Sequence, residues 1–193
     1  MVKYFFLIFS VITTEAAFAQ LTVNIQWQSI KPGYSGDTIY YETDRKLSWA
    51  DFKGRPDAAS PAAAITQSGF GYRMSMQSYN NRTTINITVF CYFNKNKSWV
   101  KRGMKTNYAL EHEQHHYDIT YINTCKFIQM LKEAKLTKSN FASVVEKIHD
   151  DCFEALNKTQ DEYDGQTSNG RIESMQFAWN KKINEQLAAL ATD

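Results

Sequence analysis

The sequence predicts an α+β fold, with antiparallel strands in the N-terminal half followed by a three-helix region. In the first half, apolar and polar residues alternate, as in "TTINITVFCYF" (residues 83–93), where Ile85, Ile87 and Val89 alternate with polar neighbours. In the second half, glycine and proline become rare and apolar residues recur every three or four positions. Strands first and helices second, in a chain without internal repeats, indicate one α+β domain.

The alternating half contains five segments that we expect to form strands. They are rich in β-branched and aromatic residues, which favour strands. They cover residues 21–27, 37–43, 47–52, 65–76 and 83–93. "SYNNR", residues 78–82, predicts a turn between the last two strands, and "FKGRPDAASPAA", residues 52–63, predicts a surface loop.

The second half predicts three helices. The first runs from about residue 104 to Ala134, the second carries apolar positions from Phe141 to Leu156, and the third covers about 172–190. "YDGQTSNG", residues 163–170, is expected to interrupt the helical region as a turn. The connection "KLTKSN" between the first two helices is short, so we expect these helices to pack antiparallel.

The N-terminus predicts export from the cytoplasm. Residues 1–19 have the pattern of a signal peptide: Lys3, then the apolar run 5–12, then Ala17 and Ala19 at the small-residue positions before a cleavage site. The apolar run is much shorter than the roughly 20 residues that span a bilayer, so we expect no stable membrane insertion after cleavage. The mature protein would then be one domain, residues 20–193, periplasmic or extracellular.

Composition and cysteine usage narrow the range of partners and metal sites that the sequence allows. The chain has 193 residues, 43% of them hydrophobic, and 22 basic against 20 acidic residues. This near balance and the lack of a basic cluster argue against nucleic acid as a partner. The three cysteines form no Cys-x-x-Cys pair, which argues against a thiolate metal cluster. A disulfide between Cys125 and Cys152 and three buried free cysteines are both compatible with the sequence.

"LEHEQHHYDI", residues 110–119, contains the pattern His-Glu-x-x-His. On a helix, residues i and i+4 are about 40° apart, so His112 and His116 can bind one Zn²⁺ ion together. Glu113 lies further round the helix, where it can take a proton from a water that zinc has acidified. The competing interpretation is a solvated polar helix face on which histidines happen to cluster. His115 is expected to be a neighbour rather than a ligand.

A catalytic zinc site needs a third protein ligand, and the residues leave several candidates. Ile119 and Ile122 occupy the positions at which an extended zinc motif would have glycine and histidine. Asp118 points to another side of the helix, and Glu146 is expected on an outer face. His149 borders the apolar face of the second helix. Asp164, in the expected turn, remains as a further candidate.

Five segments in the same order resemble a bacterial family of predicted secreted zinc-dependent proteases, described as a domain of unknown function. They are "LSWADFKG", "SWV", "LEHEQHHYDI", "QDEYDGQTSNG" and "QFAWNKKINEQL". The resemblance covers roughly residues 40–190 and implies a zincin-like α+β domain. It assigns His112, Glu113 and His116 to the family's zinc motif. Tyr163, Asp164, Thr167 and Gly170 match a later segment, Tyr-Asp-x-x-Thr-x-His-Gly, in which Asn169 of this chain replaces histidine.

The sequence therefore carries two functional hypotheses. The first is an exported zinc-dependent hydrolase, a peptidase acting on peptides or proteins, with His112, His116 and Asp164 as metal ligands and Glu113 as the catalytic base. The second is a non-catalytic exported binding module that has lost its third zinc ligand, as the asparagine at position 169 suggests. Tyr163 could donate a hydrogen bond to the substrate or simply pack at the end of the second helix. The substrate and the oligomeric state are not encoded in any recognisable pattern.

Overall fold

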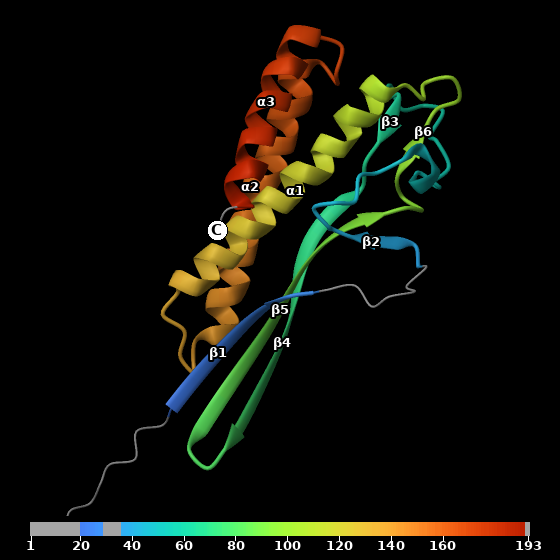
Figure 1. The fold of residues 1–193 in the computed structure, drawn as a ribbon. Helices are drawn as coiled ribbons and strands as arrows, with labels where there is room; N and C mark the ends of the chain where they lie inside the picture. The colour runs from blue at the N-terminus through green and yellow to red at the C-terminus, as the bar shows by residue number, and fades with distance from the viewer. Residues whose placement is uncertain (1–19, 29–35, 192–193) are drawn as a thin grey trace, which may run out of the picture.

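The computed structural model describes residues 20–28 and 36–191 and has the predicted α+β order, strands before helices (Figure 1). The strands are β1 (Gln20–Trp27), β2 (Thr38–Tyr40), β3 (Ala64–Ile65), β4 (Ser68–Tyr79), β5 (Arg82–Asn94) and β6 (Trp99–Val100). The helices are α1 (Asn107–Glu133), α2 (Phe141–Thr167) and α3 (Glu173–Leu190). The predicted signal peptide, residues 1–19, lies outside the described residues.

The main sheet is built around β5. Antiparallel β4 pairs with β5 along its whole length, and antiparallel β2 pairs with its last residues. β1 differs from the expected antiparallel arrangement because it runs parallel to the first part of β5. A long connection separates β1 from β5, and it includes β2, β3 and β4. Such a crossover permits parallel pairing, whereas a tight turn permits only antiparallel pairing.

The turn between β4 and β5 is confirmed where the sequence predicted it. β4 ends at Tyr79 and β5 begins at Arg82. Asn80 and Asn81 both have positive φ values, 46° and 61°. Two successive left-handed residues form the turn that matches the twist of a hairpin, and asparagine tolerates this conformation better than most residues.

Two expected strands have a different local structure. Within residues 47–52, Trp49–Asp51 form a short 3-10 helix. Its cap explains the difference: the Asp51 carboxylate accepts hydrogen bonds from the backbone N–H and the hydroxyl of Ser48, at 2.9 Å each. The expected strand 65–76 divides into β3 and β4 around Gln67, whose backbone N–H donates to the Ser98 hydroxyl.

Helix α1 is the central layer of the molecule. It lies between the sheet and the pair formed by α2 and α3 (Figure 1). The predicted antiparallel packing of α1 and α2 is confirmed, because Asn123 contacts Cys152 and His116 contacts Gln160. The main core lies on both sides of α1 and consists of Phe70, Ile85, Ile87, Val89, Ile119, Ile122, Phe127, Leu131, Val145, Cys152, Leu156, Tyr163, Trp179 and Ile183.

The N-terminal half of α1 is polar and nevertheless buried. Asp118 is 1% exposed, and its Oδ1 atom accepts hydrogen bonds from the Tyr41 hydroxyl and the Gln114 amide, both at 2.8 Å. Gln114 in turn accepts the backbone N–H of Leu47 at 2.7 Å. A buried polar group is costly unless it is hydrogen-bonded, so this network fixes α1 against the segment that follows β2.

Cys91, Cys125 and Cys152 are all free, so the Cys125–Cys152 disulfide is not formed. Cys91 and Cys152 are buried, in agreement with the alternative of small core residues, and Cys125 is half-buried. Among the described residues, no helix has the length and apolar character needed to cross a bilayer.

The Asp118 network predicts a large effect on stability. Replacing Asp118 by alanine (Asp118→Ala) leaves the Tyr41 hydroxyl and the Gln114 amide buried without their acceptor. We therefore expect the free energy of unfolding to fall by about 3 kcal/mol. The matched control is Asp151→Ala, whose partner Lys147 is largely exposed; this change should cost less than about 0.5 kcal/mol. Urea denaturation of both variants checks the difference, and equal losses would contradict it.

The same network predicts that the stability of the fold depends on pH. Burial raises the pKa of Asp118, but hydrogen bonds from His115, Tyr41 and Gln114 and the charge of Lys46 outweigh burial and leave the pKa below its usual value. The ionised form therefore stabilises the fold fully above the unfolded pKa of about 3.9, and this contribution is lost as pH falls through the lower folded value. The stability gap between the parent and Asp118→Ala should narrow below about pH 4.

Candidate metal centre

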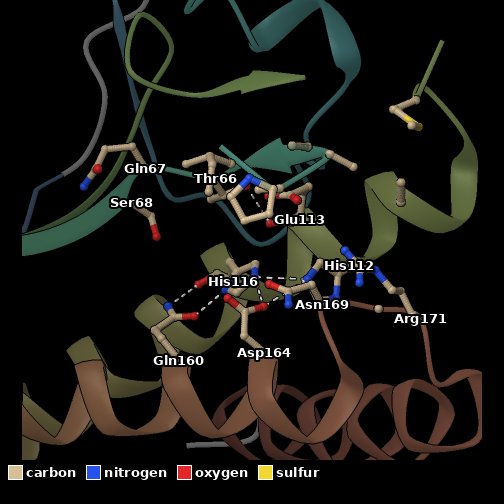
Figure 2. Close-up of a pocket in the computed structure, with 18 of the residues that line it drawn as sticks. Thr66, Gln67, Ser68, His112, Glu113, His116, Gln160, Asp164, Asn169 and Arg171 are labelled. Atoms are coloured by element: carbon tan, nitrogen blue, oxygen red, sulfur yellow. Dashed lines mark hydrogen bonds and ion pairs between the residues drawn. The ribbon is translucent and has the colours of Figure 1, made fainter. Parts of the chain in front are cut away.

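Three side chains from two helices meet at one point. His112 and His116 lie one turn apart on α1, and Asp164 reaches them from α2 (Figure 2). The Nε2 atoms of the two histidines are 3.2 Å apart. The Asp164 Oδ1 atom lies 3.2 Å from the Nε2 atom of His112 and 3.1 Å from that of His116. These three residues form a group that can hold a metal ion.

The other nitrogen of each imidazole ring is held by a glutamine. The Nδ1 atom of His112 lies 2.8 Å from the Gln176 Oε1 atom, and the Nδ1 atom of His116 lies 2.6 Å from the Gln160 Oε1 atom. An amide oxygen can only accept a hydrogen bond, so both Nδ1 atoms carry the proton. In the neutral ring, both Nε2 atoms then present a lone pair to the shared point.

The orientation of each glutamine is fixed by its own amide group. The Gln160 Nε2 atom donates to the backbone carbonyl of His116 at 2.9 Å. The Gln176 Nε2 atom donates to the Tyr163 hydroxyl at 2.6 Å, while that hydroxyl donates to the backbone carbonyl of His112. Neither amide can be flipped without losing a buried hydrogen bond, so the ring tautomers follow from the packing of α2 and α3 against α1.

When both rings are neutral, three electron-rich atoms therefore face one another without a hydrogen between them. The Asp164 Oδ1 atom is buried and has no hydrogen-bond donor among the described residues. Such an arrangement is repulsive unless a cation or a proton lies between the atoms. In a tetrahedral zinc site with bonds of about 2.0–2.1 Å, ligand atoms lie about 3.3–3.4 Å apart. The observed separations of 3.1–3.2 Å approach that geometry and leave a fourth position open towards the cavity.

The charges of the site favour the ionised forms of both His116 and Asp164. Burial lowers the pKa of His116, but Asp164, Glu113 and Gln160 outweigh burial and raise the pKa to about 8. Burial raises the pKa of Asp164, but the two histidines outweigh it and leave the pKa well below its usual value. Asp164 is therefore a carboxylate at neutral pH, which is the form that binds a metal ion.

Glu113 lies next to this point on the wall of the same cavity. Its side chain is 5% exposed, and the Oε2 atom is buried without a hydrogen-bond partner among the described residues. Its backbone carbonyl accepts the Thr66 hydroxyl at 3.1 Å. A buried carboxylate oxygen without a donor is costly, so its position calls for a ligand or water molecule in the cavity. His112 and Glu113 of the His-Glu-x-x-His motif are both buried, which contradicts the alternative of a solvated polar helix face.

Asp164 lies on a helix rather than in the turn that the sequence predicted. Helix α2 continues through Gly165 and ends at Thr167, whose hydroxyl donates to the Tyr163 carbonyl at 2.7 Å. The glycine weakens the helix by about 1 kcal/mol, but the burial of Tyr163 and Thr167 on either side offsets this cost. The result is a rigid helical support for the candidate third ligand.

The residues after α2 bring the chain close to the metal centre. Ser168, Asn169 and Gly170 all have positive φ values, so the helix ends in a left-handed turn. Gly170, with a φ of 77°, lies so close to His112 that an added Cβ atom would meet its Nδ1 atom at 3.3 Å. Asn169 lies beside Asp164 and His112 in Figure 2, on the cavity wall.

The cavity has a volume of about 650 Å³. One wall is the extended segment 61–68, which includes β3; the other walls come from the start of α1, from α2 and from the turn after α2. The metal-binding group and Glu113 lie between these walls (Figure 2).

The other candidates from the sequence lie elsewhere. His149 packs in an aromatic cluster with Phe70, Tyr72, Phe127 and Phe153, away from the two metal-motif histidines, and Glu146 is exposed. His115 contacts Asp118, so none of these three residues joins the metal group.

Tyr163 is fully buried and stacks on the His112 ring. Because its hydroxyl is already engaged with Gln176 and the His112 carbonyl, the packing interpretation of Tyr163 is confirmed.

Gln160 and Gln176 were not identified from the sequence. Glutamine has no characteristic metal motif, and the two residues lie 44 and 64 positions from their histidines. One signal was available for Gln160, because it lies four residues before Asp164 and so shares its helix face. Both glutamines also begin segments by which the family resemblance was identified.

No protein-family model, curated protein or solved structure matches this chain.

The geometry predicts that the protein binds a metal ion through Asp164, and Zn²⁺ serves as the probe. Asp164→Asn removes the anionic ligand and should weaken zinc binding at least about 100-fold. The control is Asp161→Asn, an exposed aspartate three residues earlier on α2, which should leave zinc affinity unchanged. Competition titration with a chromophoric chelator measures both; equal affinities for the two variants would exclude Asp164 as a ligand.

Zinc affinity should also depend on pH. Because the pKa of His116 is raised to about 8 in the metal-free protein, a proton must leave His116 before a metal ion can bind. The apparent affinity should fall about tenfold per pH unit below pH 8 and level off above it. A titration in which the affinity is constant from pH 6 to pH 8 would contradict this assignment.

Replacing Gln160 by alanine should weaken zinc binding about 10- to 100-fold without removing a ligand, because His116 then loses the acceptor that fixes its ring. Gln129→Ala, on the exposed side of α1, is the control and should have no effect. The Co²⁺-substituted proteins give a second readout, because their visible absorption reports ligand geometry. An unchanged spectrum and affinity in Gln160→Ala would show that the hydrogen bond does not orient the ring.

Proposed function

We propose that this protein is an exported zinc-dependent peptidase of the kind that the family resemblance implies. The observation that carries the proposal is the convergence of two imidazole lone pairs and one carboxylate oxygen beside the unpaired carboxylate oxygen of Glu113. Two histidines and one carboxylate are a ligand set of catalytic zinc sites, which leave one position open. The nitrogen ligands favour Zn²⁺ over Mg²⁺ or Ca²⁺.

Zinc would supply Lewis acidity, which lowers the pKa of a water molecule and polarises the carbonyl oxygen of the substrate. Glu113 would accept a proton from the attacking water as the new bond between the water oxygen and the carbonyl carbon forms. The carbon–nitrogen bond of the peptide then breaks, and Glu113 returns the proton to the amine that leaves. The products are a carboxylic acid and an amine, with no other reactant than water.

The strand edge beside the metal centre supports a peptide as the substrate. β3 pairs with β6 on one side only, and no other described strand pairs with its second edge. The segment that contains β3 lines the cavity from residue 61 to residue 68. An extended peptide can add to such an edge through main-chain hydrogen bonds. The Thr66 hydroxyl fixes this segment to α1 at Glu113, so the edge and the base have a set distance from each other.

Asn169 is the residue best placed to assist as a hydrogen-bond donor. It lines the cavity beside Asp164, and a side-chain amide can donate to a carbonyl oxygen on which negative charge develops. Tyr163 is excluded from this role because its hydroxyl is buried and already paired.

The alternative of a non-catalytic binding module rested on the loss of a third ligand at position 169. The contacts of Asp164 with both histidines offer a third ligand from another residue, which favours the catalytic proposal. In this view, the asparagine at position 169 does not make the site incomplete.

Replacing Glu113 by glutamine tests the proposal. Glu113→Gln keeps the shape of the site but removes the base, so zinc should still bind while peptide hydrolysis falls about 10²–10⁴-fold. The control Glu111→Gln changes an exposed glutamate on the same helix and should retain full activity. The measurement is hydrolysis of a casein-derived peptide mixture followed by mass spectrometry. Absence of hydrolysis by the zinc-loaded parent protein, or equal rates in parent and Glu113→Gln, would refute the peptidase proposal.

A further inference from the structure

Large apolar side chains that remain exposed are concentrated at the cavity. Nine large hydrophobic residues are exposed among the described residues: Ile65, Met76, Tyr79, Met104, Tyr108, Met130, Phe153, Ile172 and Phe177. Four of them line the cavity: Ile65, Met104, Tyr108 and Phe153. Exposed apolar groups that gather at a concave site mark a surface where another apolar group binds.

These residues lie on both sides of the metal centre. Helices α1 and α2 are antiparallel, so the residues before His112 on α1 run in the opposite direction from the residues before Asp164 on α2. Tyr108 precedes His112 by one helical turn, with Met104 just before the helix, whereas Phe153 precedes Asp164 by three turns. The apolar side chains therefore flank the metal-binding group instead of forming one pocket at its end.

The α2 wall leads directly from Phe153 to the metal centre. Phe153, Asn157, Gln160 and Asp164 are spaced by three or four residues and share one helix face, and all line the cavity. Phe153 is 50% exposed while its neighbour Leu156 is buried. Figure 2 shows Gln160 and Ser68 on one side of the histidines and Arg171 on the other. Phe153 thus extends the Gln160 side, and Met104 and Tyr108 belong to the opposite side.

The length of this surface fits a chain segment rather than a single residue. With a rise of about 1.5 Å per residue, Phe153 lies roughly 16 Å along α2 from Asp164, and Tyr108 lies roughly 6 Å along α1 from His112. Together they span roughly 22 Å, which equals six or seven residues of an extended peptide. A peptide on the free edge of β3 would have room on both sides of the metal centre.

We infer that the site accepts the interior of an extended polypeptide with bulky apolar side chains on both sides of the bond to be cut. This inference rests on the proposed function and adds the substrate class: unfolded or flexible apolar segments rather than chain termini. Phe153 forms the apolar subsite on the α2 side, and Met104 with Tyr108 forms the subsite on the other. Lys101 and Arg171 also line the cavity, but the Lys101 ammonium group already donates to the Ser60 carbonyl.

The test uses zinc-loaded Glu113→Gln protein, so that binding is measured without cleavage. The probe is a fluorescein-labelled heptapeptide, blocked at both termini, with leucine or phenylalanine on each side of the central bond. Fluorescence anisotropy should show at least about tenfold tighter binding of this peptide than of a matched serine peptide. Phe153→Ser and Met104→Ser should each weaken binding of the apolar peptide about tenfold.

The matched control is Phe177→Ser. Phe177 is 72% exposed on α3 and does not line the cavity, so its replacement should leave binding unchanged. Equal affinity for the apolar and serine peptides, equal effects of Phe153→Ser and Phe177→Ser, or preferred binding of an aspartate-containing peptide through Arg171 would each overturn the inference. If the peptides bind as expected but the parent protein hydrolyses none of them, the result supports the inferred surface and refutes only the peptidase proposal.

Discussion

The burial of the polar first half of α1 is the constraint on which the rest of the structure depends. Residues 112–115 and Asp118 are all less than 9% exposed, and each places polar atoms where water is scarce. Such burial is tolerated only if other groups supply hydrogen bonds. Those groups come from every other part of the fold: Tyr41 and Leu47 from the strand half, Gln160 from α2 and Gln176 from α3.

The carboxylates that face the cavity differ from Asp118, because each has a buried oxygen atom without a donor among the described residues. On the Asp118 side, the oxygen atoms are bonded to donors, and the network behaves as a structural anchor. On the cavity side, Oε2 of Glu113 and Oδ1 of Asp164 have no donor among the described residues. This contrast distinguishes the hydrogen-bonded Asp118 side of α1 from the carboxylates of α1 and α2 that face the cavity. Unpaired buried carboxylate oxygens are a cost to folding that a binding role explains.

A metal ion at this point would also link the layers of the protein. His112 and His116 belong to α1 and Asp164 to α2, while the orienting glutamines belong to α2 and α3. Binding would replace the proton on His116 by a cation that attracts all three ligand atoms, and it would hold α2 against α1 at the same time. Metal affinity and the packing of the three helices are therefore coupled through the same side chains.

Periodicity predicted the strands and helices well, because the hairpin 68–94 and the helices show clear two- and 3.6-residue repeats. It also placed His112, Glu113 and His116 together, since their relative position is set by one helix. The parallel pairing of β1 and the continuation of α2 past Gly165 depend on tertiary contacts and are not visible locally. Gln160 and Gln176 could not be predicted for the same reason, because their role arises only when three helices pack together.

The candidate site is built mainly on regular secondary structure, which holds its parts at set distances from one another. The candidate ligands and base are held on helices, and the segment that contains β3 is fixed to α1 by the hydrogen bond between Thr66 and Glu113. If a peptide binds at this edge as proposed, its distance from Glu113 is set before it arrives, which reduces the entropy lost on reaching a reactive geometry. The turn of Ser168, Asn169 and Gly170 is the one part of the metal-centre wall in left-handed backbone conformation, and Gly170 allows it to lie against His112. Asn169 is thus positioned by backbone geometry, and its side-chain amide forms no hydrogen bond with another described residue.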